Sequence, residues 1–383
     1  MAAIELDLAH AYRPNPQQDS DYALLPLKMR FEDGGAYALL GPSGCGKTTM
    51  LNIISGLVQP SHGTVTFAGQ DVTRLSPQQR NIAQVFQFPV IYDTMTVAEN
   101  LAFPLKNRGV AAAKIKTRVG QIAEMLEMSG QLDQRAAGLT ADAKQKISLG
   151  RGLVREDVSA VLFDEPLTVI DPHLKWQLRR KLKQIHRELK LTLIYVTHDQ
   201  VEALTFAEQI VVMTRGRAVQ MGSADALFER PQHMFVGNFI GSPGMNFLPA
   251  QLAGRVLTLA GQALTLDAAL AARLPQQPPN FTLGVRPEYV ELSASNTVGA
   301  LRTTVAKVQD VGTYWLITAR VGEALVRVRL DAQTEPPREG SEIWLKVLGQ
   351  HSCFYGADEH LLDVQQPDAE NANNTANNEE TPA

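Results

Sequence analysis

Three apolar runs without alternation stand out in the first half of the chain, at residues 37–40, 159–163 and 193–196. Such continuous runs are typical of parallel strands that are buried on both faces. Polar groups follow two of them directly, and a further strand is expected over residues 81–88, ending near Gln87. Because ligands gather at the carboxyl ends of parallel strands, we expect functional side chains at these strand ends.

Other segments of the first 240 residues follow different periods. Short apolar and polar alternation with turn residues over 4–40, and a strand pair at 64–67 and 71–72, predict a small antiparallel layer. Residues 94–154 have helical spacing, with a capping box from Thr96 to Glu99 and a second helix from about 142 to 154. Leucines and isoleucine from 174 to 189 predict an amphipathic helix with a basic, solvated face.

The pattern changes beyond Gly237, where a linker over 241–246 leads into many short strands. We expect strands at residues 256–260, 263–266, 281–285, 313–320, 324–330 and 341–347. Many short strands separated by turns indicate a small barrel. The residues from Gln365 onward are rich in Asn, Glu, Pro and Ala, which predicts a disordered tail.

Composition narrows the function classes. The 383 residues are enough for two or three domains, and the net charge of -4 gives no reason to expect a nucleic-acid partner. Cys45 and Cys353 are far apart in sequence, which fits a reducing compartment rather than a disulfide framework. No apolar stretch is long enough to cross a bilayer and the amino terminus shows no signal-peptide pattern, so any membrane role is expected to come through partners.

The most specific motif lies between the first apolar run and a predicted helix. It has the spacing of a phosphate-binding loop, and its residues are Gly41, Pro42, Ser43, Gly44, Cys45, Gly46, Lys47 and Thr48. Glycines let backbone N–H groups point at phosphate oxygens, and the helix directs its positive end to the same place. Lys47 is expected to reach the β- and γ-phosphates and Thr48 to bind Mg²⁺. The alternative is a Gly-rich turn, which has no need of this lysine and hydroxyl.

Candidate catalytic groups follow the other strands. Asp164 is expected to hold Mg²⁺ and Glu165 to polarise the attacking water, although two acids at a strand end can also form an ordinary turn. Gln87 can coordinate a metal-bound water or be only a polar strand end. His198 can donate to the γ-phosphate or be a helix cap. Tyr12 can stack on adenine or simply pack in its layer.

Taken together, these residues resemble the ATP-binding-cassette (ABC) ATPases over roughly the first 240 positions. The resemblance rests on the phosphate loop, Gln87, residues 163–166, Asp171 and residues 197–203. It implies an α/β P-loop cassette with a RecA-like core, an antiparallel β layer and a helical subdomain. It further implies that Tyr12 stacks on adenine, that Thr48, Gln87 and Asp164 surround Mg²⁺, that His198 is the switch histidine, and that Asp171 keeps its loop functional. Thr49 joins the residues expected to bind ATP.

In this family the ATP is held between one subunit's phosphate loop and the other subunit's signature helix. Where the family usually has Leu-Ser-Gly-Gly-Gln, this chain has Leu139, Thr140, Ala141, Asp142 and Ala143. Thr140 keeps a hydroxyl, whereas Asp142 brings a carboxylate toward a phosphate; the alternative is that Asp142 only caps the helix. We therefore expect pairing with a second, non-identical ABC ATPase subunit, with one composite site weaker than the other.

The region around Gly284 to Glu288 resembles the accessory barrel of carbohydrate-type importer ATPases. Residues 81–93 and 139–142 look most like one of the paired ATPase subunits of glycerol importers. The resemblance implies an ATPase domain over 1–236, an OB-like barrel over 237–365 and a tail over 366–383. It also implies two integral membrane permeases, an indirect periplasmic solute-binding partner and a place at the cytoplasmic face of the cell membrane. Glycerol is the favoured solute, before glycerol phosphate or a sugar. The alternatives are a nucleotide-sensing regulatory subunit and a non-transport ABC ATPase.

Overall fold

The computed structural model describes residues 2–168, 170–266, 271, 274, 279–295 and 297–362. It divides into two compact units, residues 1–226 and residues 227–383, and each is described here by itself. The expected tail at 366–383 lies outside the described residues. The expected domain limits of 1–236 and 237–365 stay a prediction.

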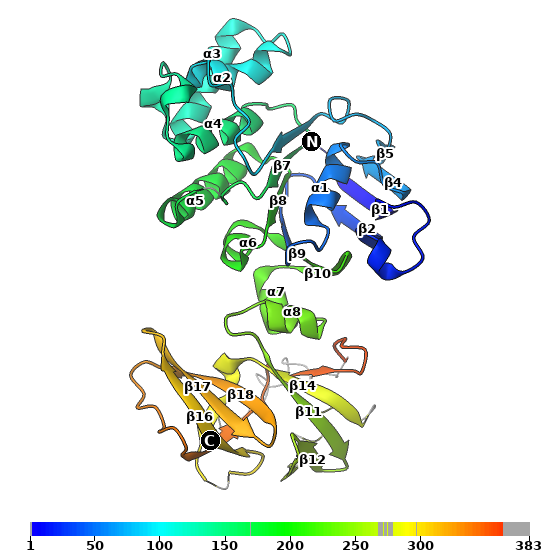
Figure 1. The fold of residues 1–383 in the computed structure, drawn as a ribbon, viewed down its shortest axis with the longest axis vertical. Coiled ribbons are helices and arrows are strands. Elements are labelled where there is room, and N and C mark those ends of the chain that lie inside the picture. Colours follow the sequence, from blue (N-terminus) through cyan, green and yellow to red (C-terminus); the bar gives the residue numbers. More distant parts are fainter. Residues whose placement is uncertain are drawn as a thin grey trace, which may run out of the picture. The chain divides into compact units, whose positions relative to one another are not determined.

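The first unit is built on a six-stranded sheet with the order β10-β9-β3-β8-β7-β6. Its strands are β3 (Ala36–Leu40), β6 (Ile82–Val85), β7 (Ala160–Asp164), β8 (Leu193–Thr197), β9 (Gln209–Thr214) and β10 (Arg217–Gly222). All pairs are parallel except that of β9 with β10. Every residue of β3 and β8 is buried, which confirms the prediction from the apolar runs. The carboxyl ends of β3, β7 and β8 therefore meet at one edge of the sheet. Figure 1 labels β7 and β8 side by side within it.

A separate antiparallel layer of the first unit has the strand order β2-β1-β4-β5. It contains β1 (Ile4–His10), β2 (Leu24–Phe31), β4 (His62–Phe67) and β5 (Gln70–Asp71), with the short 3-10 turn η1 (Asp19–Asp21). The expected antiparallel layer over 4–40 is confirmed for its first two strands, whereas 36–40 belongs to the six-stranded sheet. Helix α1 (Lys47–Ser55) packs between the two sheets, where Met50, Leu51 and Ile54 join one buried cluster.

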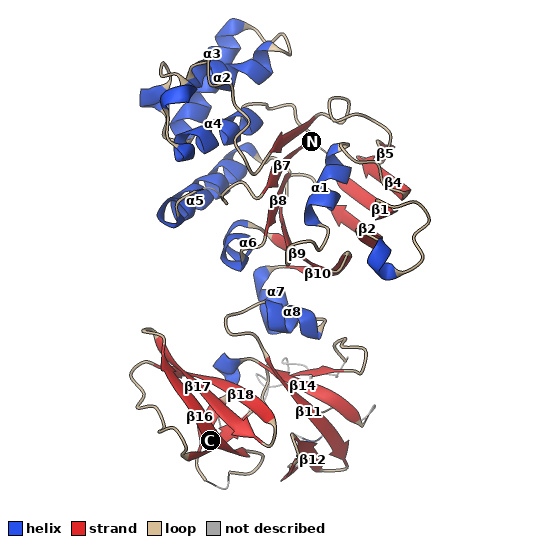
Figure 2. Ribbon diagram, viewed as in Figure 1, coloured by secondary structure: helices blue, strands red, loops and turns tan. Residues whose placement is uncertain are grey.

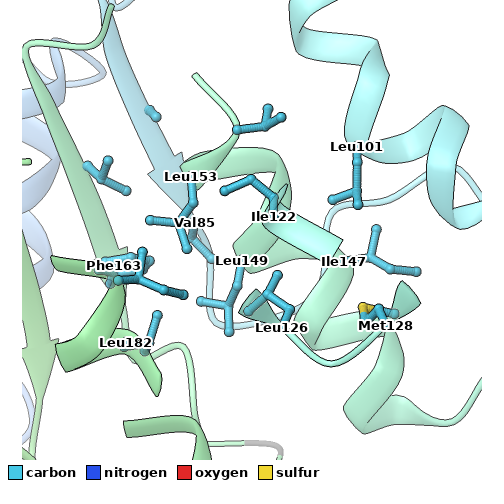
Figure 3. Close-up of a cluster of buried hydrophobic side chains, with 14 of the residues drawn as sticks. Val85, Leu101, Ile122, Leu126, Met128, Ile147, Leu149, Leu153, Phe163 and Leu182 are labelled. Carbon is cyan, nitrogen blue, oxygen red and sulfur yellow. The ribbon is translucent and has the colours of Figure 1, made fainter. Parts of the chain in front are cut away.

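A helical subdomain follows, and two more helices return the chain to the sheet. Its elements are α2 (Val97–Lys106), α3 (Ala112–Met125), η2 (Ser129–Gln131), η3 (Ala136–Gly138) and α4 (Ala141–Leu153), followed by α5 (Pro172–Leu189) and α6 (Gln200–Phe206). The capping box from Thr96 to Glu99 is present. Figure 3 shows side chains of α4 meeting Val85 and Phe163 of the sheet, so the subdomain shares its core with β6 and β7.

The second unit is almost entirely β-structure (Figure 2). Its elements are α8 (Met234–Phe239), β11 (Asn246–Ala253), β12 (Val256–Leu259), β13 (Gln262–Thr265), β14 (Asn280–Val285), η4 (Pro287–Tyr289), β15 (Glu291–Ser293), β16 (Leu301–Asp310), β17 (Tyr314–Val321), β18 (Ala324–Asp331), β19 (Glu342–Lys346) and β20 (Cys353–Tyr355), and α7 (Ala224–Glu229) precedes them. They form two five-stranded antiparallel sheets, β13-β12-β11-β14-β20 and β15-β19-β16-β17-β18. The predicted strands are confirmed, but the sequence pattern did not show β11, β15, β16 or β20.

Among the described residues, no helix is long and apolar enough to cross a membrane.

Arg286 ties the helices of the second unit to its sheets. Its side chain is 1% exposed, and its guanidinium donates to the carbonyl oxygens of Phe228 at 2.7 Å, Leu227 at 3.4 Å and Gly237 at 3.4 Å. It also donates to the carbonyl of Ile240. The charged plane lies 3.8 Å from the centroid of the Phe228 ring. One buried arginine thus satisfies carbonyls at the ends of two helices.

Replacing this side chain with an apolar one should destabilise the second unit. Arg286→Met removes the guanidinium donor from four carbonyl oxygens, of which that of Gly237 keeps the N–H of Met245, and we expect it to lower the free energy of unfolding by about 3 kcal/mol or more. Guanidinium titration followed by circular dichroism measures the change. Arg302→Met is the matched control, because Arg302 is an exposed arginine whose partner is Glu342, and its transition should not move. Equal stability of Arg286→Met and the unaltered chain would contradict the structural role of Arg286.

Candidate functional site

The loop between β3 and α1 has the backbone of a phosphate cradle. Gly44 and Gly46 have positive φ values of 78° and 103°, and Gly46 is the N-cap of α1. A Cβ on Gly41 would lie 2.2 Å from the carbonyl oxygen of Met213, and one on Gly46 would lie 2.5 Å from that of Ala23. The loop therefore needs glycine at these positions to keep its curl, because any side chain would collide with backbone.

Lys47 lies inside this curl. Its side chain is 5% exposed, and its ammonium group donates to the carbonyl oxygens of Gly41 at 2.8 Å and Pro42 at 3.0 Å. The group therefore sits over the loop, at the N-terminal end of α1, where N–H groups and the helix dipole favour an anion. Cys45 is buried beside it, and burial raises the pKa of its thiol. The cradle fits a polyphosphate whose oxygens replace the two carbonyls as partners of Lys47.

Two oxygen-bearing side chains stand next to the cradle. The Thr48 hydroxyl donates to Oδ1 of Asp164 at 3.2 Å, which joins the start of α1 to the end of β7. Burial raises the pKa of the Asp164 carboxyl, and the hydrogen bond from Thr48 works against that rise. A hydroxyl and a carboxylate fit Mg²⁺, which is usually held by one or two protein oxygens together with substrate phosphates. Bound there, Mg²⁺ would offset the negative charge of the phosphates. Among the described residues, no group of three or more His, Cys, Asp or Glu side chains could hold a metal ion. A magnesium ion at Thr48 and Asp164 would therefore also need phosphate oxygens as ligands.

Glu165 follows Asp164 directly in the chain and contacts His198. His198 Nδ1 donates to Oε2 of Glu165 at 3.1 Å, and the Thr168 hydroxyl donates to the same oxygen at 3.3 Å. Glu165 has a φ of 46°, a left-handed conformation that turns the chain sharply after β7. The structure thus brings together two groups that are 33 positions apart in sequence. Their roles as base and switch stay predictions.

The other residues expected in the site are Tyr12, Asp171 and Gln87, and they lie in different parts of the first unit. Tyr12 lies just beyond β1, and a hydrogen bond of 3.1 Å joins its hydroxyl to that of Thr49 on α1. Asp171 directly precedes α5. The expected strand over 81–88 was too long, because β6 ends at Val85 and Gln87 lies in the irregular segment beyond it. Gln87 is half-buried there.

The altered signature lies at the start of α4. The Thr140 hydroxyl accepts the backbone N–H of Ala143 at 3.3 Å, so Thr140 is the N-cap of the helix. Asp142 is in the first turn and is not the N-cap itself, and a first-turn acid still favours the start of a helix, so both interpretations of Asp142 stay predictions. One of its carboxylate oxygens lies 3.7 Å from the Lys146 ammonium group, and the other is buried without a hydrogen-bond partner in the described structure.

Glu202 is a site residue that sequence reasoning did not single out. It is 4% exposed and accepts hydrogen bonds from the Tyr195 hydroxyl at 3.0 Å and the Thr197 hydroxyl at 2.8 Å. Asp199 accepts the N–H groups of Val201 and Glu202 and caps α6. These bonds fix the turn that carries His198. The sequence signal was an acid in the first turn of a helix after a strand, which is too common to indicate this role.

The geometry of these residues indicates the kind of enzyme site that they form. A glycine-rich cradle at a helix N-terminus, a buried lysine, a hydroxyl with a carboxylate, and a second acid bonded to a histidine form a nucleoside triphosphate hydrolase site. Residues 24–168 match the family described as ABC transporter. Residues 241–290 match the MalK OB fold domain and residues 283–354 the TOBE domain.

Individual relatives extend the match over most of the chain. It is 39% identical over 343 residues to the sn-glycerol-3-phosphate import ATP-binding protein UgpC of Salmonella choleraesuis, covering 88% of this chain and 92% of that protein. The UgpC protein of Paraburkholderia xenovorans is 38% identical over 339 residues, covering 87% and 93%. The chain belongs to the ABC transporter ATP-binding proteins, in the importer class that carries OB and TOBE domains. It is an ATPase subunit that uses ATP and Mg²⁺.

A solved structure supports the fold of the cassette. The chain of CbiO1 from Clostridium perfringens, described as part of the ABC transporter complex CbiONQ, superposes with a TM-score of 0.54. It is 24% identical in sequence and covers 60% of this chain and 90% of that chain. The superposition bears on the fold alone.

The pairing of Glu165 with His198 leads to a kinetic prediction. Glu165→Gln keeps the size of the side chain but removes its basicity, so kcat for ATP hydrolysis should fall at least about 100-fold while ATP binding is retained. Turnover is measured in the assembled transporter and binding by titration of the full chain. Glu188→Gln, at an exposed acid of α5, is the control and should hydrolyse ATP normally. Unchanged turnover in Glu165→Gln would show that another group is the base.

Proposed function

We propose that this chain is the ATP-hydrolysing subunit that powers uptake of a small glycerol-type solute across a cell membrane. The Thr48–Asp164 and Glu165–His198 contacts around the phosphate cradle support ATP hydrolysis. The similarity to import ATP-binding proteins is the observation that supports its coupling to uptake. Hydrolysis at this edge of the sheet can be coupled to transport only through other proteins. From the similarity to import ATP-binding proteins, we propose that the partners of this chain are two integral membrane permeases, with a periplasmic solute-binding protein acting through them, and that the chain works at the cytoplasmic face.

Glycerol is the solute that we propose, before glycerol phosphate. The UgpC relatives are named for sn-glycerol 3-phosphate, which supports the three-carbon skeleton. Both relatives carry the same name, so these comparisons by themselves favour the phosphorylated solute, and the choice of glycerol rests on the sequence alone. Residues 81–93 and 139–142, which resemble a glycerol importer subunit, favour the unphosphorylated polyol.

The carboxylate in the signature supports pairing with a different ATPase chain. Asp142 has a buried oxygen without a hydrogen-bond partner in the described structure, on the helix end that is expected to close over the other subunit's ATP. A like charge facing a phosphate weakens that composite site, and a second, non-identical subunit would leave one site of the pair with an ordinary signature. The same observation supports the second candidate function, a nucleotide-sensing subunit with weak ATPase activity.

Transport by the assembled complex tests the proposal. With its permeases and binding protein in proteoliposomes, the chain should drive ATP-dependent uptake of radiolabelled glycerol, and Lys47→Ala should abolish it because the phosphates lose their buried cation. Labelled sn-glycerol 3-phosphate is measured in parallel. Uptake of the phosphate alone would overturn the choice of solute, and ATP hydrolysis without uptake of either would favour the sensing subunit.

The signature carboxylate leads to a separate prediction. Asp142→Asn removes the charge at nearly constant volume, and we expect ATP turnover of the assembled transporter to rise by up to about tenfold, since like charges at this range oppose each other by on the order of 1 kcal/mol. Asp225→Asn is the matched control, because Asp225 is also a first-turn acid but lies on α7. Mass spectrometry of the purified complex shows whether one or two kinds of ATPase chain are present.

Two outcomes would contradict this account. Turnover that stays equal or falls in Asp142→Asn would show that the carboxylate does not face a phosphate. A complex containing two copies of this chain and no other ATPase would exclude the mixed pair.

A further inference from the structure

A buried histidine lies against the tyrosine that is expected to stack on adenine. His10, the last residue of β1, is 6% exposed, whereas Tyr12 is 64% exposed. The two rings meet edge to face, with centroids 4.6 Å apart and planes at 86°. Such pairs are a favoured aromatic geometry and restrict how both rings turn. In this geometry the His10 ring covers at most one face of the Tyr12 ring, and Tyr12 is mostly exposed, so a face is open for a base.

The Ser61 hydroxyl fixes both the strand end and the histidine ring. Its oxygen accepts the N–H of Ala11 at 3.0 Å and its proton goes to the carbonyl of Ala11 at 2.9 Å. A hydroxyl has one proton and two lone pairs, so the contact of 3.3 Å with Nδ1 of His10 uses the remaining lone pair. His10 therefore donates from Nδ1. Because burial lowers the pKa of this imidazole, the ring is neutral near pH 7 and Nε2 carries a lone pair.

That lone pair has no hydrogen-bond partner in the described structure, and its atom is buried. The hydroxyl of Tyr12 is held independently by Thr49 at 3.1 Å. The Tyr12 ring is thus fixed at two points, the hydroxyl by α1 and the ring by His10, and α1 is the helix that begins in the phosphate cradle.

We propose that His10 is a positioning residue for the nucleotide base: it sets the orientation of the Tyr12 ring, and so controls the affinity for the base of ATP but not for its phosphates. The inference rests on the proposed function, in which this site binds ATP. The base stacks on the open side of Tyr12, while the triphosphate lies in the cradle around Lys47. His10 touches neither part of the nucleotide and acts only through Tyr12.

Two ligands, one with a base and one without, separate the contribution of the base to the affinity from that of the phosphates. The full chain is titrated calorimetrically with MgATP and with magnesium tripolyphosphate, which has no base. His10→Ala should raise the Kd for ATP about two- to tenfold, the range that corresponds to ordering one freed side chain when the base binds, and leave the Kd for tripolyphosphate unchanged. His10→Phe restores a ring at this place and should bring the ATP affinity back to within about twofold of the unaltered chain. In the assembled transporter, His10→Ala should raise KM and leave kcat as it is.

A double-mutant cycle with Tyr12→Ala tests whether His10 acts through Tyr12. If it does, His10→Ala adds no further loss of ATP affinity to Tyr12→Ala. His62→Ala is the matched control, since His62 is an exposed histidine at the start of β4, and its ATP affinity should equal that of the unaltered chain.

The outcomes distinguish this inference from the proposed function. An unchanged ATP affinity in His10→Ala, an equal loss for ATP and tripolyphosphate, or a loss that adds to that of Tyr12→Ala would overturn the role of His10 while ATP binding still depends on Lys47. ATP binding that is equally strong in Lys47→Ala would instead overturn the site itself, and the role of His10 with it.

Discussion

The close backbone contacts of the phosphate loop are the constraint on which the site depends. Gly41 and Gly46 lie so near the carbonyl oxygens of Met213 and Ala23 that no side chain fits at either position. These oxygens belong to β9 and to the segment before β2, so both sheets of the first unit must be in place before the loop takes its shape. The cradle is therefore local in sequence but depends on contacts that are distant in sequence.

Parallel strand pairing then brings the chemistry to this loop. β3, β8 and β7 are neighbours in one sheet, and Asp164 pairs in register with Val196, just before Thr197 and His198. Thr48 reaches Asp164 from α1, and Glu165 turns back to His198 through its left-handed conformation. Each contact joins residues on different elements, so the site is complete only when the strands of the sheet are paired.

The sequence predicted the parts of the fold that have a strong period. Continuous apolar runs gave β3, β7 and β8, and the capping box at Thr96 gave the start of α2. It did not show β16, because only Leu301, Thr303 and Val305 alternate as buried residues and the outer half of that strand is mostly exposed. The phosphate loop was readable because its residues are contiguous. The His10–Ser61–Tyr12 contacts were not, since they depend on the pairing of β1 with β4.

The altered signature shows how helix stability and catalysis can oppose each other at one position. An acid in the first turn of α4 is favourable to the helix dipole, and Lys146 partly offsets its charge from 3.7 Å away. The same N-terminal N–H groups are those that would attract a phosphate, so the carboxylate competes for them with the nucleotide. Thr140 still caps α4, so the N-terminal end of the helix keeps its shape. Its charge differs from that of the usual signature because of the Asp142 carboxylate. Under the proposed function, the defect therefore acts on the ATP of the paired subunit, while the cradle of this chain keeps all of its own groups.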